Sequence, residues 1–258
     1  MNKGDIFKGI KQWPAEIDGH PGQMPIFYPQ TEYMAAGFTA STKEVKKFLP
    51  DPLMHPVEFM PGRAMVMFVA FEYAESDLRP YNEFAIAFLI KYGCRPIPGL
   101  TSLNQLMKRS FEVYVWHLPV TTEAALAYGK HYWGFPKFVS EINFTNRGGI
   151  RECTVGEKGV KILTLRGKQL NTKPSPISHF RTYSVKDGIT LIGTIYNSNL
   201  RFAQHVLFHP DDARLEIYNQ HPISKDLLTL DLSEKPVVYQ YSDLDDMVLF
   251  GGRNLIDR

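Results

Sequence analysis

The feature that most constrains the fold is a series of strand-length segments rich in β-branched and aromatic residues, bounded by Gly, Pro, Asn or Asp. These segments are residues 64–74, 84–92, 111–118, 138–144, 160–166, 189–196, 203–208 and 237–241. Helical patterns do not alternate with them, as they do in parallel βαβ folds. The sequence therefore predicts a mainly β protein, α+β only at its margins, with one large antiparallel sheet that is curved or closed.

Few helices are expected beside this sheet. Residues 41–44 read Ser-Thr-Lys-Glu, a capping box in which the serine and the glutamate satisfy backbone N–H groups at a helix start. Residues 224–230 predict a second short helix. Gly148-Gly149 predicts a turn between neighbouring strands. No stretch has the length of a domain linker, so residues 1–258 are expected to form a single domain.

Composition agrees with one globular unit and excludes several partners. At 258 residues and 44% hydrophobic content, the chain can bury a sizeable core without disulfides or metal. Cys94 and Cys153 fit reduced, buried thiols of a cytoplasmic protein. Because 29 basic residues face 27 acidic ones, no nucleic-acid or membrane-surface partner is expected. Residues 1–18 are interrupted by charges and predict no signal peptide, and the longest apolar runs are too short to span a bilayer.

One lysine stands in an aromatic and rigid setting. Lys137 follows Phe135-Pro136 and precedes Phe138, with Trp133 shortly before. An ammonium that aromatic side chains shield from water loses its proton more readily, and the neutral amine can form a Schiff base with a ketone. The alternative is a lysine whose stem covers an aromatic surface while its charge stays in water. Composition alone favours this alternative, because lysines are almost never fully buried.

The residues before the lysine predict a helix. Thr122 is a hydroxyl cap, Glu123 places an acid in the first turn, and residues 124–127 are apolar helix formers. Gly129 is expected to end this helix. The following strand, 138–144, would then carry Lys137 at its mouth.

At this point the residues resemble a family. The segment from Gly129 to Lys137 resembles the region around the Schiff-base lysine of acetoacetate decarboxylases, an established example of an activated amine. In that family a glycine, a basic residue, a turn and an aromatic-Pro-Lys sequence occur in the same order. Tyr81-Asn82-Glu83 resembles the Tyr-x-Glu that supplies a glutamate to the pocket, and Phe71-Glu72 is similar to a second pocket glutamate. Weaker matches are Glu32-Tyr33, Leu49-Pro50-Asp51-Pro52-Leu53 and residues 221–227.

The resemblance implies a fold and a function. The sheet would form a cone or barrel around a central cavity, and the protein would be a homo-oligomer. Lys137 would be the nucleophile, Glu83 and Glu72 would orient it or move protons, and Trp133, Phe135 and Phe138 would form an aromatic shell around the substrate. The activity implied is decarboxylation of acetoacetate or a related β-keto acid through an imine and an enamine, with no cofactor and no metal.

The sequence departs from the family pattern at two positions. Phe138 stands where the characterised decarboxylases have a second lysine, so any activation of Lys137 must depend on desolvation more than on an adjacent cation. Thr31 stands where the family has an entrance arginine. This puts acetoacetate itself in question as the substrate. A carboxylate clamp could instead come from Arg63, Arg79 or Arg95.

Two other functions stay open. The same lysine chemistry serves aldol addition and dehydration of small keto acids and aldehydes, and the family resemblance includes enzymes of that kind. A non-catalytic β-barrel that binds a small metabolite is a different class of answer, because fold does not fix function.

Histidines give weaker signals than the lysine. His205 and His209 are expected to be a structural pair, since no further metal-ligand pattern accompanies them. His117 and His131 flank the helical segment before Lys137 and are either proton carriers or core histidines.

Overall fold

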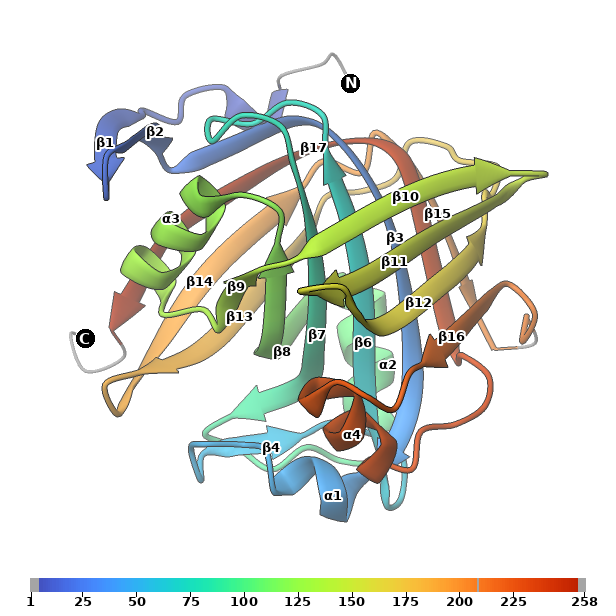
Figure 1. Cartoon of the computed structure of the whole chain (residues 1–258). Coiled ribbons are helices and arrows are strands. Elements are labelled where there is room, and N and C mark those ends of the chain that lie inside the picture. Colours follow the sequence, from blue (N-terminus) through green and yellow to red (C-terminus); the bar gives the residue numbers. More distant parts are fainter. Residues whose placement is uncertain (1–4, 208, 255–258) are drawn as a thin grey trace.

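Seven strands form a closed barrel in this computed structural model, which describes residues 5–207 and 209–254 (Figure 1). The barrel strands are β3 (Ile26–Ser41), β6 (Arg63–Tyr73), β7 (Tyr81–Tyr92), β8 (Ser110–Val120), β13 (Ser178–Lys186), β14 (Ile189–Asn197) and β17 (Val238–Asn254). They are ordered β7-β6-β3-β17-β14-β13-β8, and β8 pairs back onto β7. Barrel neighbours are antiparallel except β8 and β13, which run parallel. The mainly β, closed fold is thus confirmed, with a mixed rather than a wholly antiparallel sheet.

A second sheet of four strands covers one side of the barrel (Figure 1). Its strands are β10 (Glu141–Arg147), β11 (Ile150–Glu157), β12 (Val160–Lys168) and β16 (Ala213–Ile217). Val155 and Leu163 of this sheet share one buried cluster with Phe68 and Phe84 of the barrel wall. Gly148-Gly149 forms the predicted turn between β10 and β11, and both glycines have φ in the left-handed region, at 58° and 76°.

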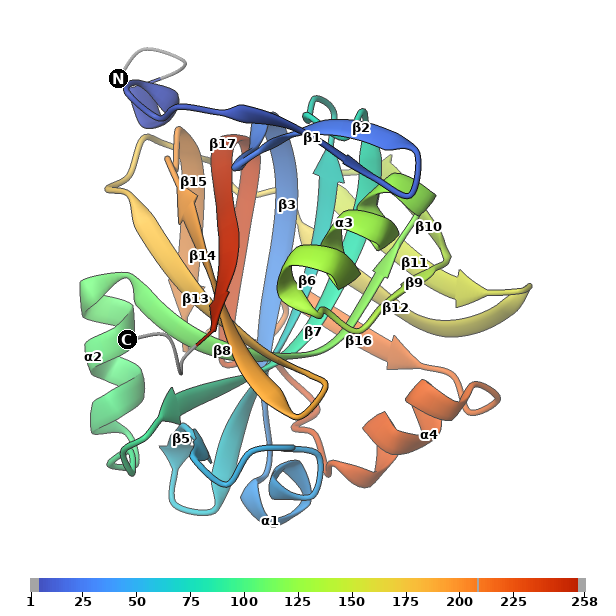
Figure 2. The same ribbon diagram turned by 90° about the vertical axis from the view of Figure 1, so that its left-hand side faces the viewer.

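The remaining elements are shorter strands and helices that lie around the barrel (Figure 2). The strands are β1 (Trp13–Ile17), β2 (His20–Met24), β4 (Met54–Pro56), β5 (Glu58–Met60), β9 (Lys137–Val139) and β15 (Arg201–Val206). The helices are η1 (Asp5–Phe7), α1 (Thr42–Lys46), α2 (Leu100–Lys108), α3 (Glu123–Trp133) and α4 (Pro222–Thr229). Within the described ranges, none of the helices combines the length and the apolar character needed to cross a membrane.

Alternating side chains divide the barrel wall into an outer and an inner face. On β6, Phe68 and Ala70 point toward the second sheet and are fully buried, at 0% exposure. Met67, Val69 and Phe71, on the other parity, face the barrel interior and line a cavity there. The densest core therefore lies between the barrel and the second sheet, and the interior of the barrel holds the site.

Several local expectations need correction. The predicted strand 138–144 is two strands, β9 and β10, separated at Ser140, whose Oγ donates to the Gly156 carbonyl at 2.6 Å. Ser41 does stand at the start of α1, but its side chain makes no capping hydrogen bond. α2 was not predicted, because its apolar residues are largely exposed and give no core-facing stripe.

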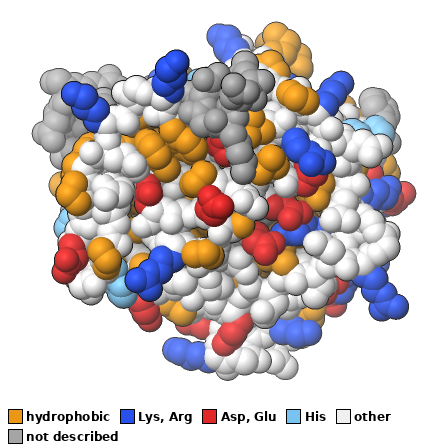
Figure 3. Space-filling view, turned by 90° about the horizontal axis from the view of Figure 1, so that it is seen from above, with side chains coloured by type: hydrophobic (Ala, Val, Ile, Leu, Met, Phe, Trp, Pro, Cys, Tyr) orange, Lys and Arg blue, Asp and Glu red, His pale blue; other side chains and the backbone are white. Residues whose placement is uncertain are grey.

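Two further predictions are met only in part. Cys153 is a free, buried thiol as expected, whereas Cys94 is free and exposed. The predicted strand 203–208 corresponds to β15, and Phe208 lies outside the described residues. On the face that Figure 3 shows, lysines and arginines are spread among acidic and hydrophobic side chains rather than gathered in one basic field.

Candidate active site

Lys137 and Glu83 form an ion pair inside the protein. The Lys137 Nζ lies 2.6 Å from the Glu83 Oε2, and the two residues are only 7% and 8% exposed. Strand register explains the meeting. Glu83 on β7 pairs with Val120 on one side of β8, and Lys137 on β9 pairs with Leu118 on its other side. Because β7 and β9 both pair with β8, they bring together two residues that are 54 positions apart in the sequence.

α3 provides the space that the lysine occupies. The helix begins as predicted, with the Thr122 hydroxyl accepting a hydrogen bond from the Ala125 N–H at 3.4 Å. It does not end at Gly129 but continues to Trp133, with Gly134 as the left-handed cap at φ 59°. Gly129 has a different purpose, because a Cβ there would lie 2.4 Å from the Lys137 Cδ. The glycine is needed inside the helix to let the lysine side chain pass.

Buried tyrosines surround the ion pair. The Tyr73 hydroxyl donates to the Glu83 Oε1 at 3.3 Å, and the Tyr81 hydroxyl donates to the Tyr28 oxygen at 3.2 Å. The Lys137 Nζ lies 5.8 Å from the centre of the Tyr81 ring. Burial raises the pKa of all three phenols well above its ordinary value, and the negative charge of Glu83 adds to this. The phenols therefore keep their protons, and those of Tyr73 and Tyr81 act as hydrogen-bond donors.

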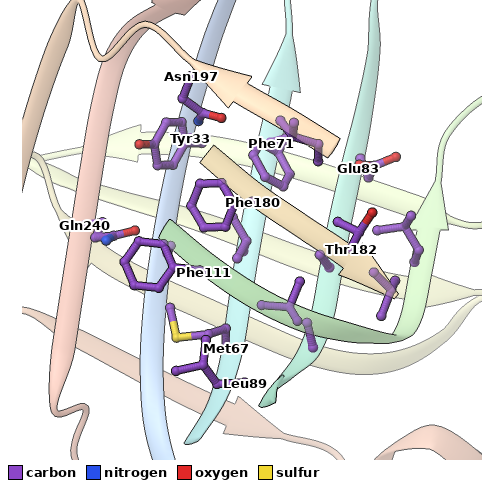
Figure 4. A pocket seen from close by; sticks show the side chains of 18 of the residues that line it. Tyr33, Met67, Phe71, Glu83, Leu89, Phe111, Phe180, Thr182, Asn197 and Gln240 are labelled. Carbon is purple, nitrogen blue, oxygen red and sulfur yellow. The ribbon is translucent and has the colours of Figure 1, made fainter. Parts of the chain in front are cut away.

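The pair lies at one end of a cavity within the barrel. The cavity has a volume of about 140 Å³ and is lined mostly by apolar side chains of the barrel strands. Figure 4 shows Glu83 at one end of the lined space and Met67 and Leu89 at the other. Among the described residues that line it, Lys137 is the one cation and Glu83 the one carboxylate. Charge is thus confined to a single end of an otherwise apolar chamber.

The expected aromatic shell is only partly in place. Phe135 lines the cavity. Trp133 stands behind it, with the two rings stacked at 5.8 Å and the Trp133 Nε1 donating to the Phe250 carbonyl at 2.8 Å. Phe138 packs instead against the core between the barrel and the second sheet. Its parity is opposite to that of Lys137 on the same short strand, which explains why it points away.

Glu72 does not reach the site. It stands between Phe71 and Tyr73, which both line the cavity, so its own side chain lies on the outer face of β6. There it forms an ion pair with Arg151, a residue only 1% exposed. Arg151 also lies 2.8 Å from Glu32, directly across from Glu72 on β3. The second glutamate expected at the site is therefore part of a separate ion cluster around the buried Arg151, which no sequence pattern indicated.

The proposed arginine clamp is also elsewhere. Arg63 pairs with Asp231 at 2.6 Å, and Arg79 and Arg95 are exposed. Thr31, at the position of the family's arginine, is fully buried and its hydroxyl has no partner. Among the described residues, no arginine lines the cavity. A substrate carboxylate in this chamber would meet Lys137 as its one cationic neighbour.

The histidines lie away from the lysine. Burial, with His221 nearby, lowers the pKa of His117 to about 4, so this ring is neutral at pH 7, and it does not line the cavity. His205, His209 and Asp212 hold potential metal-ligand atoms within 4.8 Å of one another, in the region between β15 and β16. Asp212 is already bonded by His205 at 2.6 Å and by Lys168 at 3.0 Å. These hydrogen bonds join the loop to β12 and β15, and the structural role of the histidine pair stays a prediction.

Most of the cavity wall was not identified from the sequence. Residues such as Met67, Asn197 and Gln240 line it (Figure 4), yet the sequence around each is typical of an ordinary strand. The one available signal was parity, because Met65, Met67, Val69, Phe71 and Tyr73 alternate along β6. Since both faces of β6 are apolar, the sequence could not tell which face was filled and which was hollow.

Known proteins share this architecture. An acetoacetate decarboxylase structure matches with a TM-score of 0.64 and 13% identity over 99% of this chain and 98% of its own. The acetoacetate decarboxylase from Legionella pneumophila gives a TM-score of 0.65 and 12% identity over 99% and 96%. The enduracididine biosynthesis enzyme MppR, in a structure with pyruvate, gives 0.63 and 13% over 90% of each chain. At these identities the likeness shows the fold alone.

Comparison of sequences identifies the family, which these structural matches alone do not. No curated protein sequence matches the chain. The model of the acetoacetate decarboxylase family, however, matches residues 14–219, which is most of the chain and includes both Lys137 and Glu83. The chain therefore belongs to the acetoacetate decarboxylase family.

Proposed function

We propose that this protein is a Schiff-base lysine enzyme that decarboxylates a β-keto acid, with Lys137 as the nucleophile. The observation that carries the proposal is the Lys137–Glu83 pair, joined at 2.6 Å and placed at the end of an apolar cavity. Lysines are almost never fully buried, so a lysine inside the barrel supports a functional role. A carbonyl substrate in this cavity would meet the amine directly. Family membership supports the same chemistry.

Glu83 acts as the proton acceptor. An ammonium cannot attack a carbonyl, so Lys137 must first lose a proton, and the Glu83 Oε2 is within hydrogen-bond reach. Transfer of that proton leaves a neutral amine and a neutral acid, which the apolar surroundings tolerate better than two charges. Tyr73 holds the other carboxylate oxygen at 3.3 Å and so fixes the orientation of Glu83.

The reaction then proceeds through an imine. The neutral Lys137 amine adds to the ketone carbon, and Glu83 returns its proton as the oxygen leaves as water. The resulting iminium nitrogen accepts the electron pair released when the bond to the carboxylate carbon breaks and carbon dioxide departs. The enamine takes a proton at carbon, and water hydrolyses the imine to free the product ketone and Lys137. Phe135 and the apolar wall limit the access of other water molecules to these intermediates.

One observation favours a second candidate, aldol addition followed by dehydration. MppR has been solved both with pyruvate and with the condensation product of pyruvate and imidazole 4-carboxaldehyde. The same Lys137 and Glu83 would form the enamine of a keto acid, which would then add to an aldehyde instead of losing carbon dioxide.

Product analysis tests the two candidates. The protein is incubated with acetoacetate and longer 3-oxo acids, and carbon dioxide release is measured above the spontaneous rate. Parallel reactions contain pyruvate with an aldehyde, and the condensation product is identified by mass spectrometry. Carbon dioxide release that disappears in Lys137→Arg supports decarboxylation, and a condensation product that disappears in the same variant supports the aldol route. If neither product exceeds that of the variant, the catalytic proposal is wrong.

A further inference from the structure

The interior of the barrel is less filled than its wall. Val66, Phe68 and Ala70, on the outer face of β6, are fully buried at 0% exposure. Met67 and Val69, on the inner face, are only partly buried although they lie inside the barrel. Protein interiors are normally packed with few voids larger than a water molecule. A barrel of this size that leaves its inner face unpacked is built to hold a molecule.

The unfilled space extends far from the reactive lysine. Every second residue of β6 from Met65 to Tyr73 lines it, and so does every second residue of β7 from Glu83 to Leu89. A strand rises about 3.3 Å per residue, so the six residue steps on β7 correspond to roughly 20 Å. The cavity is therefore a corridor that begins at the Lys137–Glu83 ion pair. Figure 4 shows its lining residues from Glu83 to Leu89 along the barrel wall.

The corridor is also uniform in chemistry. Beyond Glu83, its walls on β7 and β8 are Ala85, Ala87, Leu89, Val113 and Phe111. Its far end is lined by other apolar side chains, among them Phe59, Leu106 of α2 and Val237. The polar side chains along the way, such as Thr182, Asn197 and Gln240, carry no charge. Such a lining recognises a flexible apolar chain and few polar groups.

The size of the corridor sets the length of that chain. Its volume of about 140 Å³ is roughly ten times the room that one water molecule requires. A four-carbon substrate bound at Lys137 would leave most of this apolar surface in contact with water. An extended hydrocarbon with bonds of about 1.5 Å advances roughly 1.3 Å per carbon, so a corridor of about 20 Å has room for about fifteen carbons in all. The carbonyl end beside Lys137 takes the first of these, which leaves about ten to fourteen carbons for the apolar chain.

From this geometry we infer the substrate class: a keto acid or ketone whose carbonyl meets Lys137 and whose unbranched apolar chain, about ten to fourteen carbons long, lies along β6 and β7. The inference rests on the proposed Schiff-base function and adds the part of the substrate that does not react. Binding of the chain would hold the carbonyl against the amine and displace water from the walls, which strengthens binding with each methylene.

A series of methyl ketones tests the inference. 2-Butanone, 2-octanone, 2-dodecanone and 2-octadecanone are each incubated with the protein and borohydride, which reduces an imine to a stable adduct. The concentration that gives half-maximal labelling of Lys137 should fall about fourfold per added methylene and stop falling once the corridor is full. Equal labelling by all four ketones, or labelling by 2-butanone alone, would overturn the long-chain substrate while leaving the Schiff base intact. No labelling by any ketone contradicts the proposed function itself, and the substrate class with it.

Variants locate the chain in the corridor. Ala87→Phe places a ring about two-thirds of the way from Glu83 to Leu89, and the preference for 2-dodecanone over 2-butanone should fall at least tenfold. Phe111→Ala lengthens the far end, and the longest ketone should gain relative to 2-dodecanone. Leu103→Phe, on the exposed face of α2 and outside the corridor, is the control and should keep the wild-type preference. An unchanged chain-length profile in both folded corridor variants means that the chain binds elsewhere and contradicts the inference.

Discussion

Gly129 and Lys137 are packed so closely that a methyl group on the glycine would lie 2.4 Å from the lysine Cδ and 2.5 Å from its Cε. The glycine is in the middle of α3, where alanine would ordinarily favour the helix by about 1 kcal/mol. Gly129 therefore lowers the stability of the helix, and it leaves room for the side chain of Lys137.

Gly129→Ala should separate these two effects. The flexible end of Lys137 can move, so the protein is expected to fold normally while the amine shifts from its place beside Glu83. A misplacement on this scale costs about 100-fold in turnover. Steady-state kinetics and thermal unfolding of the variant check both parts. Ala127→Ser, a change of similar size on the same helix, is the control, and equal activity losses in the two variants would contradict the packing argument.

Glu83→Gln removes the proposed proton acceptor while keeping the shape of the side chain. Because general-base catalysis contributes about 100- to 10,000-fold, turnover should fall by that range. Glu72→Gln is a matched control on the neighbouring strand, since this carboxylate points to the outer face and bonds Arg151. It should leave turnover unchanged. If turnover falls equally in the two variants, Glu72 takes part in the reaction, which contradicts its position on the outer face of β6.

Arg151→Met should destabilise the fold rather than the chemistry. Arg151 lies between Glu32 and Glu72, which pair across β3 and β6 and would repel each other without it. Because the Glu32 and Glu72 side chains are 25% and 42% exposed, water screens part of this repulsion, and the loss in the free energy of unfolding should be about 1 kcal/mol. Denaturant titration measures this loss. In a Glu32→Gln, Glu72→Gln background the same substitution should cost far less, and an equal cost there rules out the electrostatic explanation.

Asp245 should give stability a pH dependence. Burial raises the pKa of this carboxyl from 3.8 to about 6, although Ser198 and Asn199 donate hydrogen bonds to it. Its folded-state pKa lies above the unfolded value, so the contribution to stability is greatest below pH 4 and is lost as the pH rises through 6. Asp245→Asn should remove this loss, on the order of 3 kcal/mol. Unfolding free energies measured from pH 4 to 7 check the prediction, which fails if both proteins follow the same curve.

The fold could be predicted to the level of its class. Strand-length runs of β-branched and aromatic residues identified β6, β7 and β8 because such residues suit a pleated, buried surface. Closure of the barrel depends on the pairing of β7 with β8 and on a parallel pairing of β8 with β13, both of which are long-range contacts that no local pattern encodes. Strands β3, β11 and β13 were not identified from their own residue patterns for a related reason, since tertiary packing rather than propensity holds them in the sheet.

The candidate site could be predicted in its two central residues. Lys137 and Glu83 were both named from short motifs, and the structure brings their side chains together. Glu72 was grouped with them by the family resemblance, and Trp133 and Phe138 by their proximity to Lys137 in the sequence. Strand alternation and helix packing turn all three side chains away from the cavity. For the corridor beyond Glu83 the one signal was the parity of the strand residues, and it could not be used because filled and hollow apolar faces look the same in sequence. The homo-oligomeric assembly and the cytoplasmic location stay predictions.

The central claim is that Lys137 forms a covalent imine with a carbonyl substrate. The most direct test is peptide mapping by mass spectrometry after incubation with acetoacetate and borohydride, alongside Lys137→Arg. The account predicts a single reduced adduct on the peptide that contains Lys137, and none in the variant. An adduct spread over the exposed lysines, or none from any keto acid or ketone, would contradict it and leave the barrel as a binding protein.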